Sequence, residues 1–318
     1  MPLPAILNGR LRLPVIGAPM FIVSNPRLVL AQCKAGVVGS FPALNARPAA
    51  QLDDWLAQLT EELATHARAH PGEPVAPFAV NQIVHASNDR LDEDVALCVK
   101  HRVPIIITSL RPPSEVVDAV HGYGGVVFHD VINRRHAEKA AAQGVDGIIA
   151  VCAGAGGHAG VLSPFALVKE IRGVFPGTIV LSGAMSTGAD VLAARALGAD
   201  LAYLGTRFIA TDEANAAPEY KEMLVASGAE DIVYSSLFSG VAGNYLRKSI
   251  VRAGLDPDRL AAGAKEGMNF GAGGAQAKAW KDIWGAGQSV AGIHGIESVA
   301  ALVARLANEY ADALSRLG

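Results

Sequence analysis

The feature that most constrains this chain is a regular alternation of short apolar, β-branched segments with amphipathic helical segments. Apolar runs occupy residues 15–17, 37–41, 78–82, 104–109, 126–131, 147–151, 178–181 and 201–204. Helical patterns lie between them at 26–34, 49–70, 91–100, 114–120, 134–143, 164–175 and 188–197. Such alternation predicts parallel strands joined by crossover helices.

The eight runs predict a (β/α)8 TIM barrel. The segments PIIIT and TIVLS are continuously apolar, as expected for strands that are buried on both faces. A chain of 318 residues suits a barrel of about 250 residues with an insertion. An open doubly wound sheet remains the alternative, because the number of strands alone does not exclude it.

The pattern changes after residue 208. Residues 209–285 contain a short helical segment at 220–227 and a Gly/Ala-rich stretch at 267–277. We expect this region to form a lid over the barrel mouth, with the barrel made of residues 1–208 and 286–318. A final amphipathic helix at 296–314 is expected to pack back on the barrel.

Composition argues against several classes of function. A net charge of −3 offers no basic surface for nucleic acid and no polybasic membrane patch. An apolar run of about 18 residues, as a membrane span requires, does not occur. The three cysteines form no CxxC pair, so neither a disulfide framework nor a metal site is expected. Without a recognisable targeting segment, we expect a cytoplasmic protein.

In a TIM barrel, functional residues lie at the carboxyl ends of the strands. The first strand is followed by Gly17, Ala18, Pro19 and Met20, which would let the backbone approach a flat ring closely. An ordinary turn is the alternative. Asn81, at the end of the third strand, could donate to and accept from a heterocycle, or could simply cap a loop.

The loop after the sixth strand contains a histidine in a glycine-rich frame. Gly156 and Gly157 precede His158, and Gly160 follows it. An imidazole with a pKa near 6.5 can accept a proton at neutral pH. We predict that His158 is a catalytic base, the alternative being a histidine on a flexible surface loop.

The seventh and eighth loops of TIM barrels often bind phosphate through backbone N–H groups. The matching positions are Ser182, Gly183, Ala184, Leu204, Gly205 and Thr206. Tight turns are the alternative interpretation of both segments.

Two further segments lie at positions of interest. Residues 284–289, which include Gln288, precede the last helix and would either face an anion or form a helix-entry loop. His129 and Asp130 end the fifth strand, where we favour a local polar pair over contact with a cofactor.

Together these motifs resemble the nitronate monooxygenases. The resemblance rests on GAPM (17–20), Asn81, AGGHAG (155–160), SGA (182–184), LGTRF (204–208) and GAGQ (285–288), and it keeps their order along nearly the whole chain. It implies an FMN-binding TIM barrel that oxidises alkyl nitronates with O2, with His158 as catalytic residue. The implied cofactor-binding residues are Ala18, Pro19, Met20, Asn81, Gly156, Gly157, Ser182, Gly183, Ala184, Leu204, Gly205, Thr206 and Gln288.

The chain also departs from this family. Many relatives carry Gln and Glu where this chain has Val151 and Gly154, and the spacing of Tyr220, Tyr234, Tyr245 and Tyr310 does not match the tyrosines of the best-known branch. The substrate is therefore more open than the cofactor. Similar barrels act as NAD(P)H-dependent quinone or enoyl-thioester reductases, and a flavin-free barrel that binds a phosphorylated metabolite is a third reading. We expect a small-molecule substrate and a monomer or homodimer.

Overall fold

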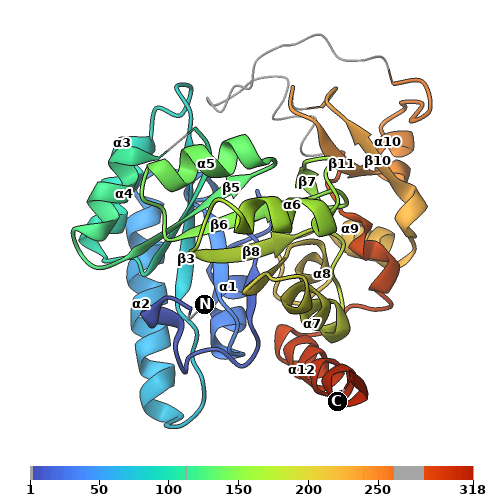
Figure 1. The fold of residues 1–318 in the computed structure, drawn as a ribbon. Helices are drawn as coiled ribbons and strands as arrows, with labels where there is room; N and C mark the ends of the chain where they lie inside the picture. Colours follow the sequence, from blue (N-terminus) through green and yellow to red (C-terminus); the bar gives the residue numbers. More distant parts are fainter. Residues whose placement is uncertain (1–2, 112, 239, 261–282, 318) are drawn as a thin grey trace.

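A parallel sheet of eight strands forms the centre of the molecule in the computed structural model, which describes residues 3–111, 113–238, 240–260 and 283–317 (Figure 1). The order is β1-β9-β8-β6-β5-β4-β3-β2. A parallel bridge between Ile16 and Val38 joins β1 to β2, and Gly17 N donates to Val38 O at 2.7 Å. The predicted TIM barrel is thus confirmed. The strands are β1 (Val15–Gly17), β2 (Gly39–Pro42), β3 (Phe78–Val84), β4 (Ile105–Leu110), β5 (Val126–Val131), β6 (Gly147–Val151), β8 (Thr178–Ser182) and β9 (Leu201–Leu204).

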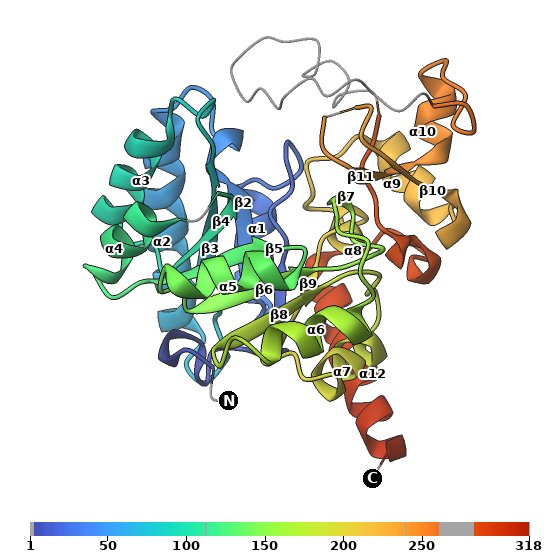
Figure 2. The same ribbon diagram turned by 45° about the horizontal axis from the view of Figure 1, so that its top comes forward.

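Helices surround this barrel, as Figures 1 and 2 show. Local sequence sets several of their starts: the side chains of Asn25, Asn133 and Ser163 accept backbone N–H groups in the first turns of α1, α5 and α6. The helices are α1 (Pro26–Lys34), α2 (Gln51–Ala69), α3 (Leu91–Lys100), α4 (Ser114–His121), α5 (Arg134–Ala142), α6 (Pro164–Arg172), α7 (Gly188–Ala196) and α8 (Thr206–Ile209), with short 3-10 turns η1 (Ala5–Leu7) and η2 (Ala43–Asn45).

The apolar side chains form two main cores. Ile16, Ile107, Phe128 and Leu201 belong to the core inside the barrel. A larger core lies between the strands and the surrounding helices. The helical periodicity of α2 explains its place there, because its buried residues Leu52, Leu56, Leu59 and Leu63 recur every three or four positions and so share one face.

A second, three-stranded antiparallel sheet, which the sequence analysis did not predict, lies beside the barrel. It consists of β10 (Ile232–Ser235), β11 (Gly243–Leu246) and β7 (Gly157–His158), in that order. Figures 1 and 2 show it next to α9 (Pro218–Val225) and α10 (Arg247–Arg252), and η3 (Ala229–Asp231) precedes β10. Strand β7 has two residues and forms through pairing with β11, so it leaves no periodic signal in the sequence.

The helix α12 (Val299–Leu317) packs against α7 and α1, as expected for the last helix. It follows η4 (Gln288–Gly292), and the carboxylate of Glu213 accepts the backbone N–H of Val299 at its start. The Gly/Ala-rich stretch 267–277 lies outside the described residues. The proposed boundary at 209–285 stays a prediction, and the second sheet includes β7 from the chain before it.

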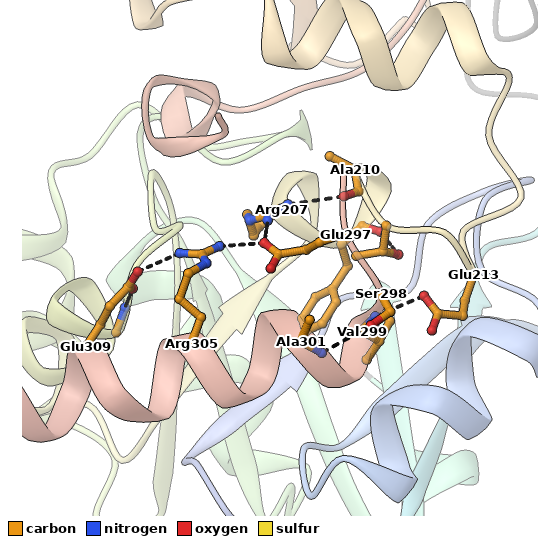
Figure 3. A network of polar contacts seen from close by, with 12 residues as sticks. Arg207, Ala210, Glu213, Glu297, Ser298, Val299, Ala301, Arg305 and Glu309 are labelled. Atoms are coloured by element: carbon orange, nitrogen blue, oxygen red, sulfur yellow. Dashed lines mark hydrogen bonds and ion pairs between the residues drawn. The ribbon is translucent and has the colours of Figure 1, made fainter. Parts of the chain in front are cut away.

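A polar network connects α12 to the helices that follow β8 and β9 (Figure 3). Arg207 of α8 is 1% exposed, and its guanidinium pairs with Glu297 and donates to Ala210 O at 3.2 Å. Arg305 donates to Glu297 at 2.8 Å and to Glu309 at 2.5 Å. Glu309 in turn accepts the backbone N–H of Gly188, the first residue of α7, at 2.7 Å. The network therefore fixes the starts of α7 and α8 relative to each other.

We predict that Glu297→Ala lowers the free energy of unfolding by about 3 kcal/mol, because it leaves the buried Arg207 guanidinium without its carboxylate. This is the lower end of the usual range, since the Glu297 side chain is 26% exposed. Urea denaturation measures the change. The control Glu138→Ala removes the exposed pair with Arg134 and should cost less than about 0.5 kcal/mol. Equal losses in the two variants would contradict the assigned role of the network.

Candidate active site

The loops that follow β1 and β9 meet at the carboxyl end of the barrel. Ala18 N donates to Leu204 O at 2.9 Å. A Cβ atom added to Gly205 would lie 3.4 Å from Ala18 Cβ and 3.7 Å from Met20 Sδ. The loops that follow β1 and β9 thus pack against each other.

Side chains from elsewhere in the chain hold the β1 loop in place. Asn45 Nδ2 donates to Met20 O at 3.0 Å and to Ser24 O at 2.7 Å, while Asn45 Oδ1 accepts Ile22 N at 3.0 Å. Ser24 Oγ accepts Met20 N at 3.0 Å. The sequence analysis missed both residues: the partners of Asn45 lie far away in the sequence, and Ser24 stands in a short loop without a motif of its own.

The loop after β6 lies directly against the GAGQ segment, at a distance that only glycine permits. A Cβ atom on Gly156 would lie 2.8 Å from Gly287 N and 2.9 Å from Thr206 Oγ1. Gly287 N itself donates to Thr206 Oγ1 at 2.9 Å. Three predicted segments, at 155–160, 204–208 and 285–288, therefore meet at one point.

Gln288 occupies the space beside Gly154. Gln288 N donates to Gly154 O at 2.9 Å. A Cβ atom on Gly154 would lie 2.8 Å from Gln288 Oε1, and its φ of +81° also favours glycine. A longer side chain at position 154 is incompatible with this placement of Gln288. The small residue at position 154 and the side chain of Gln288 thus fit each other.

The loop after β8 packs against the same β6 loop. Cys152 N donates to Ser182 O at 2.9 Å. Gly183 has a φ of +146°, and a Cβ atom there would lie 2.9 Å from Ala153 O. Ala184 also has a positive φ, of 53°. The loops that follow β6, β8 and β9 consequently open on one side of the barrel.

His158 lies in β7, within the second sheet. It is paired with Gly243 of β11 and is partly buried. Burial lowers the pKa of His158 to about 4, so its imidazole is neutral at pH 7 and able to accept a proton. Asn244 Nδ2 donates to Ala155 O at 2.6 Å and so holds the same loop. Asn244 was missed because it lies almost ninety residues later in the chain.

Two tyrosines of the C-terminal region also support these loops. Tyr234 Oη donates to Ala159 O at 3.1 Å, next to His158. Tyr220 donates to Gly285 O, and its ring stacks on Trp284 with 4.7 Å between centroids. Both side chains thus fix loop positions.

The ends of β3, β4 and β5 are linked by hydrogen bonds. Asn81 Nδ2 donates to Ser109 Oγ at 2.9 Å, and Ser109 Oγ donates to Asp130 Oδ2 at 2.6 Å. His129 instead contacts Thr108 Oγ1 at 2.8 Å. The expected polar pair of His129 and Asp130 is therefore wrong: consecutive residues of a strand point to opposite faces.

Within the described ranges, no group of three or more His, Cys, Asp or Glu side chains could hold a metal ion. In the same part of the chain, no helix has the length and apolar character needed to cross a membrane.

Comparison with known proteins identifies the family. The nitronate monooxygenase family model matches residues 7–309. A nitronate monooxygenase of Paraburkholderia phytofirmans is 27% identical over 281 residues, which cover 77% of this chain and 76% of that protein. A (3aS,4S,5R,7aS)-5-hydroxy-7a-methyl-1-oxo-octahydro-1H-indene-4-carboxyl-CoA dehydrogenase of Mycobacterium tuberculosis is 26% identical over 241 residues, 75% of this chain but 64% of that protein.

Solved structures share the fold. Nitroalkane oxidase from Streptomyces ansochromogenes superposes with a TM-score of 0.80 at 23% identity, over 99% of this chain and 100% of the other. FabK from Thermotoga maritima gives a TM-score of 0.77 at 21% identity, over 100% and 99% of the two chains. Because the family model covers almost the entire sequence, the chain belongs to the nitronate monooxygenase family of flavin-dependent oxidoreductases.

Proposed function

We propose that this protein is an FMN-dependent nitronate monooxygenase that oxidises alkyl nitronates with O2 and uses His158 as a catalytic base. The observation that carries the proposal is the contact of Gly156, in the loop that holds His158, with Thr206 and Gly287. Family membership supports the reaction class, and this contact supports the place of the site.

The residues at the barrel mouth fit a flat, phosphorylated cofactor. A Cβ atom added to Gly157 would meet nothing within 4 Å, so open space lies beside its backbone, where a ligand can approach the main chain closely. We assign contacts with the phosphate and ribityl chain of FMN to nine residues: Gly156, Gly157, Ser182, Gly183, Ala184, Leu204, Gly205, Thr206 and Gln288. Contacts with its isoalloxazine ring are assigned to Ala18, Pro19, Met20 and Asn81. FMN, when bound, supplies the redox and oxygen chemistry of the reaction.

His158 would act on a substrate that arrives as a neutral nitroalkane, because an alkyl nitronate has already lost the proton concerned. A neutral imidazole accepts the proton from the carbon next to a nitro group, and the electron pair stays on the substrate as an anionic nitronate. Burial keeps the imidazole neutral at pH 7, since it lowers the pKa of His158 to about 4. Tyr234 and Asn244 hold the backbone on either side of this residue and so fix its position.

A second candidate is an NAD(P)H-dependent reductase of quinones or enoyl thioesters. The name of the M. tuberculosis relative describes a dehydrogenase of a CoA thioester. This second candidate would use NAD(P)H.

We also propose that residues 209–285 form a lid over the barrel mouth and that the protein is cytoplasmic.

We expect anaerobic reduction of the flavin by propionate 3-nitronate to be much faster than by NADH or NADPH. Stopped-flow absorbance on the purified yellow protein measures all three rates. Faster reduction by a nicotinamide would reverse the order of the two candidates, and a colourless protein would favour a barrel that binds a phosphorylated metabolite without flavin.

We predict that His158→Asn retains bound flavin but lowers turnover of a neutral nitroalkane by about 10² to 10⁴-fold, the usual contribution of a general base. Wild-type turnover should persist below pH 6, because the pKa of His158 lies near 4 and the neutral base is lost only as the pH falls through that value. Steady-state rates from pH 4 to pH 8 test both points. Unchanged turnover in the variant would exclude the role.

We predict that Gly156→Ala weakens FMN binding by roughly 10- to 100-fold, because overpacking costs about 1 to 3 kcal/mol. The new Cβ atom would push on Gly287 N and Thr206 Oγ1. Gly228→Ala is the matched control, since a Cβ atom there meets nothing within 4 Å. Titration of apoprotein with FMN, followed by flavin fluorescence, gives the dissociation constants; equal values for both variants would contradict the assigned contact.

A further inference from the structure

The inward face of the barrel carries a polar layer above its apolar core. Ala79, Ile107, Phe128 and Leu201 belong to the apolar interior. Because side chains alternate along a strand, the residues two positions further point the same way, one step closer to the carboxyl end of the barrel. Those residues are Asn81, Ser109, Asp130 and Tyr203.

Two polar atoms of this layer have no hydrogen-bond partner among the described residues. They are Asp130 Oδ1 and Tyr203 Oη, and both are buried. The other carboxylate oxygen, Asp130 Oδ2, accepts from Ser109 Oγ at 2.6 Å. Buried polar groups almost always have a partner, so two unpartnered atoms in one layer indicate a place for a polar group from outside the chain.

Among the described residues on the inward face of the barrel around Asp130, one other group is titratable. From the neighbouring strands, β4 contributes Ser109, β6 contributes the apolar Ile149 and Val151, and β3 adds Asn81 through Ser109. From β9 comes Tyr203: burial and then the charge of Asp130 raise the pKa of its hydroxyl well above the usual value, so the two groups interact.

We propose that Asp130 and Tyr203 form a proton-holding pair at the floor of the cofactor pocket, and that Asp130 exchanges one proton with solvent while the cofactor is bound. The inference rests on the proposed function, because Asn81, an assigned contact of the flavin ring, is linked to Asp130 through Ser109. The complementary ligand is the polar edge of a heteroaromatic ring, which offers both donors and acceptors.

The chemistry of Asp130 suits this role. Burial raises the pKa of Asp130 to about 6, although the hydrogen bond from Ser109 lowers it. The carboxyl is therefore mostly neutral at pH 5 and mostly charged at pH 7. A negative charge that appears beside a flavin changes the energy of its electronic states and its affinity for electrons.

The test on the flavin-loaded protein is an absorbance titration of the long-wavelength flavin band from pH 4.5 to pH 8. We expect a shift of the band with a midpoint near pH 6. Asp130→Asn should abolish the shift, and Ser109→Ala should move the midpoint to higher pH, because it removes the hydrogen bond that favours the charged form. The control Glu138→Gln, on the exposed face of α5, should leave the titration unchanged.

A second test uses the apoprotein and thus does not depend on cofactor binding. A carboxyl with a raised pKa stabilises the fold below its unfolded-state pKa and loses that stabilisation as the pH rises through the folded-state value. The melting temperature of Asp130→Asn relative to wild type should therefore rise between pH 4 and pH 7.

The outcomes separate the two proposals. The proposed Asp130–Tyr203 pair would be overturned if the yellow protein shows no absorbance transition, or if the transition persists in Asp130→Asn. Either result would leave the proposed function intact. A colourless protein whose apoprotein arm behaves as expected would support the pair and remove FMN as the cofactor. If Asp130→Asn does not fold, an unmoved midpoint in Ser109→Ala would overturn the inference.

Discussion

The close contact of Gly156 with Gly287 and Thr206 is the constraint on which the rest of the site depends. It joins a loop from the middle of the barrel to a segment that follows the second sheet, and the hydroxyl of Thr206 connects both to β9. Any side chain at position 156 would separate these elements. The absence of a Cβ atom at position 156 is therefore required for this arrangement of the barrel mouth.

The polar network behind this contact explains how the mouth stays in place. Arg207 follows Thr206 directly and is buried. Its pairing with Glu297 therefore holds Thr206, which contacts Gly287, in a fixed place relative to the residues just before α12. Glu309 extends the same network to the first turn of α7. A buried ion pair of this kind contributes little net stability but defines one arrangement, because leaving either charge unpaired is costly.

The barrel was predictable from sequence because its signals are local. The strands at 15–17, 147–151 and 201–204 have the expected bounds, since each is a continuous apolar run. The sequence also placed the motif segments 155–160, 204–208 and 285–288 near one another, and the structure brings these three segments together. Strand β7, Asn45 and Asn244 were not, since their partners lie far away in sequence. The layer that contains Asp130 and Tyr203 could not be predicted, because it becomes apparent only from the register of β3, β4, β5 and β9. The end of β5 alone suggested the incorrect pairing of His129 with Asp130.

The two-residue strand β7 has a further consequence. The residue proposed as base is aligned by pairing with β11 of the second sheet, whereas the residues proposed to contact the flavin ring follow β1 or lie in β3 of the barrel. The orientation of the His158 imidazole therefore depends on β10 and β11, which lie outside the barrel strands. A substitution in β11 that shifts this pairing would move the imidazole while the barrel strands keep their positions.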